Sequence, residues 1–275
     1  MIDLDLLQQT DPIEWPETAT EALIAVLGTP TERDDDELML AAQLVTVGGV
    51  LNDVTAAALC ALLDDEGLAD EVRAQAALAL GPALQEFDEE GEWDFGEDAV
   101  LSVETFRLAC DTLMEIFADE DQPPLLRRRA LEAAVRAPQD WHAEAIANAF
   151  AHDDHDWQLT AVFCMRWVPG FETEILEALD SESDLLRGEA LLAAGAWEIE
   201  AAWPVIEALL VAEDTEKDLR LAAIEAAVGM PTDDADAIFA ELVDHHDEEI
   251  AAAAADAMMM IAAMAGELEE LEEEL

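Results

Sequence analysis

Histidine and carboxylate side chains come closest together in the sequence at His152, Asp154 and His155. Imidazole nitrogens and carboxylate oxygens suit zinc, iron or manganese. The adjacent His245 and His246 form a second, smaller group of the same kind. Carboxylates are frequent in every comparable segment, so a solvated acidic turn is the competing interpretation. We therefore predict no bound metal and no cofactor, and keep the first three residues as candidate ligands.

Other motifs for catalysis are missing from the sequence. Cys60, Cys110 and Cys164 lie in apolar stretches, and none belongs to a CxxC pair, so we expect buried free thiols. We find no persuasive spacing of Ser, His and Asp or of Cys and His, and no glycine-rich phosphate loop. No catalytic residue is predicted.

The few cationic residues are unevenly distributed. Five of the ten arginines fall between Arg127 and Arg166, and aromatic residues lie close by in the sequence. Arginine and tryptophan often dominate the energetics of interfaces. We predict a partner-binding patch formed by six residues: Arg128, Arg129, Arg136, Phe163, Arg166 and Trp167. The alternative is that the two aromatic residues belong to the core and the arginines neutralise nearby carboxylates.

An acidic insertion, residues 87–98, interrupts the pattern of the chain and contains Trp93 and Phe95. Aromatic residues in an acidic loop resemble a docking segment, so we predict that these two also bind a partner. A disordered surface loop is the alternative interpretation.

The charge of the chain is extreme. Asp and Glu number 67 against 11 Lys and Arg, giving a net charge of −56, yet 52% of the residues are hydrophobic. A disordered chain lacks such apolar content, so we expect a folded protein with an acidic surface. Three explanations stand side by side: solubility in a salt-rich cytoplasm, a basic partner or mimicry of nucleic acid, and a compositional bias of the lineage. Direct nucleic-acid binding is disfavoured, because an acidic surface repels phosphate.

Targeting segments are also absent from the sequence. The first ten residues have no basic region followed by an apolar stretch, and no run of about 18 apolar residues could span a bilayer. We predict a cytoplasmic protein with no membrane partner.

The elements that position these residues are short helices with a recurring pattern. Residues 184–197 combine Asp184, Arg187 and Ala190 at the spacing of one helix face, and this pattern returns along the chain. Small residues allow close approach of neighbouring helices. The anchoring alanines recur mostly at intervals of about 30 residues: Ala41, Ala76, Ala130, Ala161, Ala190, Ala223 and Ala253. A helix that recurs in this way indicates a stacked array.

At this point the chain resembles the short HEAT-like repeats of the phycobilisome-lyase-like repeat family. The matching residues are Asp70, Val72, Arg73 and Ala76, then Asp184, Leu186, Arg187 and Ala190, and more weakly Leu219, Arg220 and Ala223. The resemblance implies an all-α fold, a right-handed α-solenoid of about seven two-helix repeats whose second helices line the concave face. It also implies that each repeated arginine bonds an acidic turn. Gln158 and Ile250 stand where two repeats should carry that arginine.

We predict three segments: an N-terminal lead-in at 1–16, the solenoid at 17–265, and an acidic tail at 266–275. The turns within the repeats are acidic and should form a ridge along one edge. The predicted function is a non-enzymatic protein-interaction scaffold that uses the concave face; a basic protein or peptide along the acidic edge is a further possible partner. The alternatives are an acidic nucleic-acid mimic that binds a basic DNA-binding protein, and a lyase-like or metal-dependent enzyme on a HEAT scaffold. HEAT-like hydroxylases use His-Glu pairs, and this chain has no His-Glu dipeptide.

Overall fold

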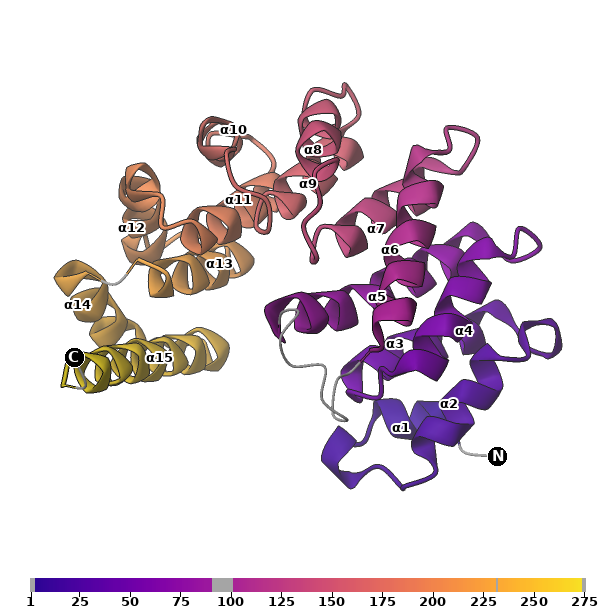
Figure 1. Ribbon diagram of the computed structural model, residues 1–275. Helices are drawn as coiled ribbons and strands as arrows, with labels where there is room; N and C mark the ends of the chain where they lie inside the picture. The colour runs from indigo at the N-terminus through magenta and orange to yellow at the C-terminus, as the bar shows by residue number, and fades with distance from the viewer. Residues whose placement is uncertain (1–2, 91–100, 231, 274–275) are drawn as a thin grey trace. The chain divides into compact units, whose positions relative to one another are not determined.

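A computed structural model describes residues 3–90, 101–230 and 232–273, with the side chains at 89–90, 233 and 265–273 left out. Within these residues the secondary structure is helical (Figure 1). The α-helices are α1 Leu4–Gln8, α2 Ala19–Leu27, α3 Asp35–Val47, α4 Asp53–Asp64, α5 Asp70–Glu90, α6 Val103–Ala118, α7 Pro124–Ala134, α8 His142–Phe150, α9 His155–Cys164, α10 Glu172–Leu179, α11 Asp184–Ala196, α12 Trp203–Val211, α13 Lys217–Val228, α14 Asp233–Leu242 and α15 Glu248–Glu273. Short 3₁₀ helices occupy Pro12–Glu14, Pro30–Glu32 and Glu200–Ala202.

The chain is an α-solenoid of HEAT-like helix pairs, as predicted. It divides into two compact units, Met1–Ala145 and Ile146–Leu275. In the first unit, α3, α5 and α7 pack in series, and α2, α4 and α6 form the neighbouring layer. In the second unit, α9, α11, α13 and α15 pack in series, and α10, α12 and α14 each pair with the helix that follows. Each unit is therefore a two-layered stack.

The alanine register predicted from the sequence is confirmed for the first six repeats. Ala41, Ala76, Ala130, Ala161, Ala190 and Ala223 are all 0% exposed. In α15 the register moves by one residue, because Ala254 is buried and Ala253 is only partly covered. Alanine at these positions lets the second helices approach one another closely.

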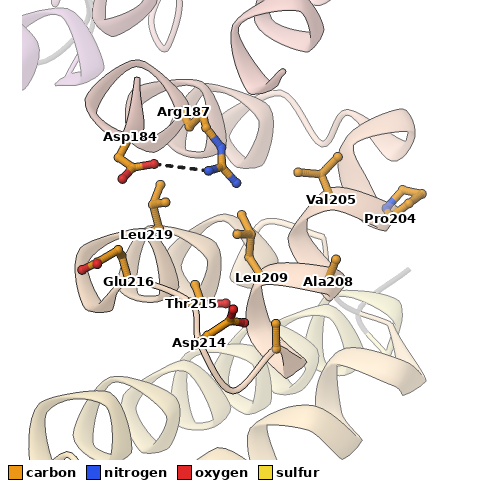
Figure 2. Close-up of a pocket in the computed structure, with 11 residues that line it drawn as sticks. Asp184, Arg187, Pro204, Val205, Ala208, Leu209, Asp214, Thr215, Glu216 and Leu219 are labelled. Carbon is orange, nitrogen blue, oxygen red and sulfur yellow. Dashed lines mark hydrogen bonds and ion pairs between the residues drawn. The ribbon is translucent and has the colours of Figure 1, made fainter. Parts of the chain in front are cut away.

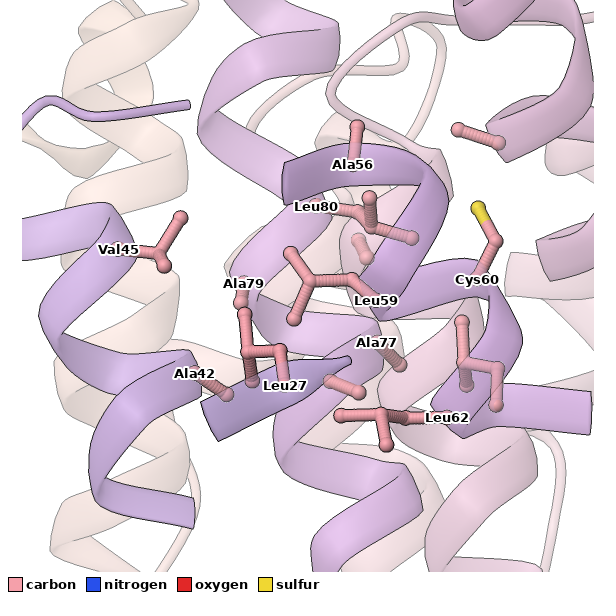
Figure 3. Packing of buried hydrophobic residues seen from close by; sticks show 14 of the residues in the cluster. Leu27, Ala42, Val45, Ala56, Leu59, Cys60, Leu62, Ala77, Ala79 and Leu80 are labelled. Carbon is pink, nitrogen blue, oxygen red and sulfur yellow. The ribbon is translucent and has the colours of Figure 1, made fainter. Parts of the chain in front are cut away.

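The core of the first unit is built from leucines and alanines of successive helices (Figure 3). Leu27 and Leu59 reach between the helices, and Ala42, Ala77 and Ala79 leave room for them. All are close to fully buried. Removing this apolar surface from water is the main term that stabilises each unit.

Local sequence signals set most helix ends. Asn52 and Thr55 form a capping box at the start of α4, and the Asp34 carboxylate accepts the N–H of Glu37 at the start of α3. At α11 the N-cap is Ser183, whose hydroxyl accepts the N–H of Leu186. Asp184 follows it as the first helical residue.

Two boundaries differ from the expectations, at the lead-in and at the insertion. The predicted lead-in contains α1, which buries Leu4 and Leu7. Helix α5 continues through Pro82 to Glu90, so the first four residues of the predicted insertion are helical; Ala83 and Leu84 beyond the proline are fully buried and hold this turn in place. The predicted C-terminal tail is helical as far as Glu273. No helix of the described residues is long and apolar enough to cross a bilayer.

Candidate functional site

One polar position recurs near the start of the second helices. Its side chain donates to a backbone carbonyl at or just beyond the end of the preceding helix, where carbonyl groups lack partners within that helix. The pairs are Arg73 Nε to Leu63 O at 2.8 Å, Arg127 Nε to Phe117 O at 2.9 Å, Gln158 Nε2 to His152 O at 2.9 Å, and Arg220 Nη2 to Ala212 O. Gln158 therefore makes the same kind of hydrogen bond to a backbone carbonyl as the arginines at the equivalent position of other repeats.

These side chains also connect neighbouring repeats. Arg73 Nη2 donates to Gln122 Oε1 at 3.0 Å, and Arg220 Nη1 lies 2.9 Å from His245 Nε2. The prediction that the arginine bonds an acidic turn is therefore wrong for Arg73, which is buried and bonds a carbonyl and an amide oxygen instead. Burial of Arg73 favours these neutral acceptors. Burying a carboxylate beside the guanidinium would require a second charged group to lose its hydration, which costs more free energy than burying a carbonyl or amide oxygen.

Arg187 departs from this pattern. Its Nη1 donates to Asp184 Oδ1 at 3.2 Å, which confirms the acidic partner predicted for this repeat. Among the described residues it makes no bond to the carbonyls that end α10. Instead its side chain extends toward the space between α11, α12 and α13 (Figure 2).

That space is a groove of about 530 Å³, which we call the edge groove. Its floor is apolar and consists of Pro204, Val205, Ala208 and Leu209 from α12 and Leu219 from α13. Its rim carries Arg187 and Asp184 on α11 and, across from them, Asp214, Thr215 and Glu216 on the α12–α13 turn (Figure 2). The edge groove has the size and the mixed lining that ligand sites usually have.

The glycines at the far end of α11 and α13 bring these helices together. A Cβ on Gly195 would lie only 2.6 Å from the Cα of Ala226, and Gly229 is packed against the backbone of Gly195 in turn. At the opposite end, residues of the first turns of α11 and α13 line the edge groove. Residues of the same two helices also line a second, smaller hollow of about 250 Å³. The backbones of α11 and α13 are therefore in contact near their C-terminal ends, while the edge groove lies beside their N-terminal ends.

The edge groove lies on an edge of the second unit that we call the turn edge, residues 152–156, 180–184, 212–218 and 244–249. Neighbouring turns are in contact there: His155 Nε2 lies 3.1 Å from Ser183 Oγ, and Lys217 Nζ lies 3.1 Å from Asp247 Oδ1. Lys217, the only lysine of the chain, also pairs with Glu249 at 2.5 Å. The bonds to Glu249 and Asp247 raise the pKa of Lys217, and the bond from Lys217 lowers the pKa of Asp247.

Exposed carboxylates dominate the turn edge. They are Asp153, Asp154, Asp156, Asp180, Glu182, Asp184, Glu213, Asp214, Glu216, Asp218, Asp244, Glu248 and Glu249. Arg187 and Lys217 form ion pairs with carboxylates of this edge. The turn edge is consequently a strongly negative surface with an apolar groove in it.

The candidate metal ligands take part in local capping. His152 Nδ1 accepts the N–H of Asp154 at 3.0 Å, Asp154 Oδ1 accepts the N–H of Asp156 at 2.8 Å, and His155 faces Ser183. Among the residues that the structure describes, no three His, Cys, Asp or Glu side chains are grouped closely enough to hold a metal ion. His245 and His246 stack on each other with ring centroids 4.3 Å apart.

The residues of the predicted Arg–aromatic patch fall in different units. In the first unit, Arg129 pairs with Glu132, Arg136 Nη1 donates to Gln85 Oε1 at 3.2 Å, and Arg128 is half-buried. In the second unit, Arg166 pairs with Glu225 at 3.2 Å and lies 5.3 Å above the ring of Trp167. The structure thus describes one cluster within each unit, and the patch that would combine them stays a prediction.

The aromatic part of the second cluster is partly covered. The rings of Phe163 and Trp167 lie 4.8 Å apart, and both residues are half-buried. Trp93 and Phe95, the predicted docking residues of the insertion, lie outside the described residues.

The prediction of buried free thiols is confirmed. Cys60, Cys110 and Cys164 are buried and unpaired by any disulfide. Burial raises the pKa of Cys60 to about 11 and that of Cys110 to about 12, so both stay protonated at neutral pH.

Comparison with known proteins gives little beyond the fold. No family model matches the chain, and no curated protein matches it either. The chain is similar to a solved structure of human deoxyhypusine hydroxylase in complex with glycerol, at 17% identity and a TM-score of 0.40. The match covers 94% of this chain and 96% of that one, which is an enzyme built as a HEAT-repeat solenoid.

This finding corrects one prediction. The non-enzymatic scaffold, with no chemistry of its own, is contradicted because the similar structure is that of an enzyme. We therefore do not carry that function further. At this identity and TM-score the likeness assigns no reaction to the chain and no role to any of its residues.

Proposed function

We propose that the second unit binds the cationic face of a basic, nucleic-acid-binding protein along its turn edge, where carboxylates take the positions that phosphates occupy in the nucleic acid. The observation that carries the proposal is the row of exposed carboxylates on turns that touch one another. Such a surface attracts cationic partners over long distances and repels DNA and RNA themselves. The phycobilisome-lyase-like subtype of the repeats and the cytoplasmic location stay predictions.

Electrostatic attraction of this kind gives fast association and strong dependence on salt. Carboxylates on the surface of a protein of charge −56 act together, because each field extends over a Debye length of about 10 Å at 0.1 M salt. We expect binding to weaken steeply as salt rises, as it does when the same partner binds phosphates.

The test uses a linker histone as the basic partner, with duplex DNA as competitor. An edge variant carries Asp153→Asn, Asp180→Asn and Glu213→Gln, three exposed positions outside the edge groove. A control variant carries Glu172→Gln, Glu200→Gln and Asp234→Asn, which are exposed residues at the opposite ends of the helix pairs and change the net charge equally.

We expect the edge variant to bind the histone about tenfold more weakly and the control variant to lose less than about twofold. Duplex DNA should displace the chain from the histone. Equal losses in the two variants would show that net charge alone drives binding, and failure of DNA to compete would remove the nucleic-acid-mimic part of the proposal.

The metal-dependent alternative has a separate measurement. Elemental analysis of the purified protein, combined with an absorption spectrum beyond the range of the aromatic residues, reports a bound transition metal or chromophore directly.

A further inference from the structure

We infer that the edge groove is a binding pocket for one arginine side chain of the basic partner, an inference that rests on the proposed function and names the group that partner inserts. The edge groove offers two carboxylates without an ion pair among the described residues, an apolar floor and the guanidinium of Arg187, which is paired with Asp184. Each of these three features restricts the occupant.

The charge of the rim requires a cation. Asp184 is paired with Arg187, whereas Asp214 and Glu216 have no cationic partner among the described residues. The hydroxyl of Thr215 lies between these two in the chain and also lines the groove. The α12–α13 side of the rim therefore presents three acceptor groups to a donor.

The floor requires an aliphatic stem behind that cation. Val205 and Leu209 are half-buried and Leu219 is buried, so their apolar atoms already face a partly enclosed space. Figure 2 shows Leu209 and Leu219 between the Arg187 side of the groove and the Asp214 side. A long side chain that covers this floor while its charged end stays at the rim removes apolar surface from water.

Guanidinium fits this rim better than ammonium. It has five N–H donors in a planar fork, enough to serve two carboxylates and a hydroxyl at once. It is also more weakly hydrated than ammonium, so entering a half-enclosed apolar groove costs it less. The occupant is accordingly arginine and not lysine.

Arg187 sets the direction of the incoming chain. Asp184 holds one of its nitrogen atoms at 3.2 Å, and its remaining N–H groups have no acceptor among the described residues. Its positive charge repels a second guanidinium from the α11 side of the groove. Its remaining N–H groups can donate hydrogen bonds there to a backbone carbonyl of the partner. Arg73, Arg127 and Arg220 occupy the same position in their repeats and bond carbonyls that follow the preceding helix, whereas Arg187 bonds Asp184 and lines the edge groove.

The experiment compares three peptides of the form acetyl-Gly-Gly-X-Gly-Gly-amide, with X as arginine, lysine or citrulline, the uncharged isostere of arginine. Binding to the full chain is followed through the methyl resonances of Val205, Leu209 and Leu219. We expect arginine to shift these methyls and to bind about tenfold more tightly than lysine, with citrulline weaker still.

A blocking variant tests the location. Ala208 is an exposed alanine on the floor, so Ala208→Trp fills the groove and leaves every carboxylate in place. Ala147→Trp, at an exposed position of α8, is the matched control. We expect the arginine preference to disappear in the first variant and to persist in the second.

The outcomes separate the two proposals. If the chain binds linker histone but the arginine and lysine peptides bind equally, or Ala208→Trp changes nothing, the groove inference is wrong and the proposed function stands. If the arginine peptide behaves as expected while the histone is not bound, the groove is an arginine pocket and the proposed function is wrong.

Discussion

His142 is a buried titratable residue of the first unit. It is 0% exposed, its Nδ1 accepts the N–H of Gln139 at 2.9 Å, and its ring meets that of Trp141 edge-on at 4.0 Å between centroids. Desolvation lowers the pKa of His142 from 6.5 to about 4. A proton on Nδ1 would remove the bond to Gln139 and bury a charge.

We predict that this residue makes the protein less stable in mild acid. Above pH 6.5 neither the folded nor the unfolded state protonates it, so its contribution is constant. Between pH 6.5 and about 4 the unfolded state binds a proton that the folded state does not, and the free energy of unfolding falls by about 3 kcal/mol in total.

Urea unfolding at several pH values measures this slope. His142→Asn keeps an acceptor for Gln139 but cannot titrate, so the gap in unfolding free energy between variant and wild type should shift in favour of the variant as pH falls. Parallel pH profiles for the two proteins would contradict the assignment. Protonation of the many carboxylates affects both proteins equally and cancels in the comparison.

At the scale of helices, the contact between α11 and α13 depends on glycine. Gly195 and Gly229 put the two backbones in direct contact at one end, and the edge groove opens at the other. A side chain at Gly195 has no space, because the backbone of Ala226 lies 2.6–2.8 Å from where its Cβ would be. Backbone cannot rotate aside as a flexible side chain does.

We predict that Gly195→Ala destabilises the second unit by about 1–3 kcal/mol, since the helices must separate to admit one methyl group. Gly188→Ala is the matched control on the same helix, where a Cβ would meet nothing within 4 Å. That control should stabilise the protein by up to about 1 kcal/mol, because alanine favours a helix over glycine.

Urea unfolding of the two variants shows directly whether each substitution raises or lowers the free energy of unfolding. Similar effects of the two substitutions would show that helix propensity, and not the contact with Ala226, governs Gly195. The methyl resonances of Leu209 and Leu219 add a second measurement, because separation of the helices at one end should alter the groove at the other.

For the whole chain, the net charge of −56 is the dominant feature. Like charges at this density oppose the compact state, and salt screens them. Arginine and lysine residues offset only a small part, and those described in ion pairs are bound to one or two carboxylates each.

We predict that the urea midpoint rises when KCl is increased from about 0.1 M to 1 M, as the Debye length shrinks from about 10 Å to 3 Å. Up to about 0.3 M, KSCN should raise the midpoint to a similar extent, because screening depends on ionic strength and not on the identity of the ion. A midpoint that is flat or falls with KCl would show that self-repulsion is already balanced in the fold.

The sequence by itself determined the solenoid and its register. Six anchoring alanines predicted from spacing are fully buried, because a helix that repeats one small-residue face can bury it only against its neighbours. Some helix ends were also determined by residues adjacent in the sequence, as the capping box of Asn52 at the start of α4 shows. Some helix boundaries were not predicted, because burial of neighbouring residues outweighed the local sequence signal. One example is α5, which continues through Pro82.

Only the tertiary structure decided where the chemistry lies. The pattern gives Arg73 and Arg187 the same place in their repeats, yet one is buried against a carbonyl and the other extends into a groove. The edge groove takes its lining from three helices and the α12–α13 turn, and the backbones of α11 and α13 meet at Gly195 and Ala226, an arrangement that no linear pattern encodes. Periodicity reports which face of a helix is buried, whereas the angle between two helices is set by the atoms that meet across their interface.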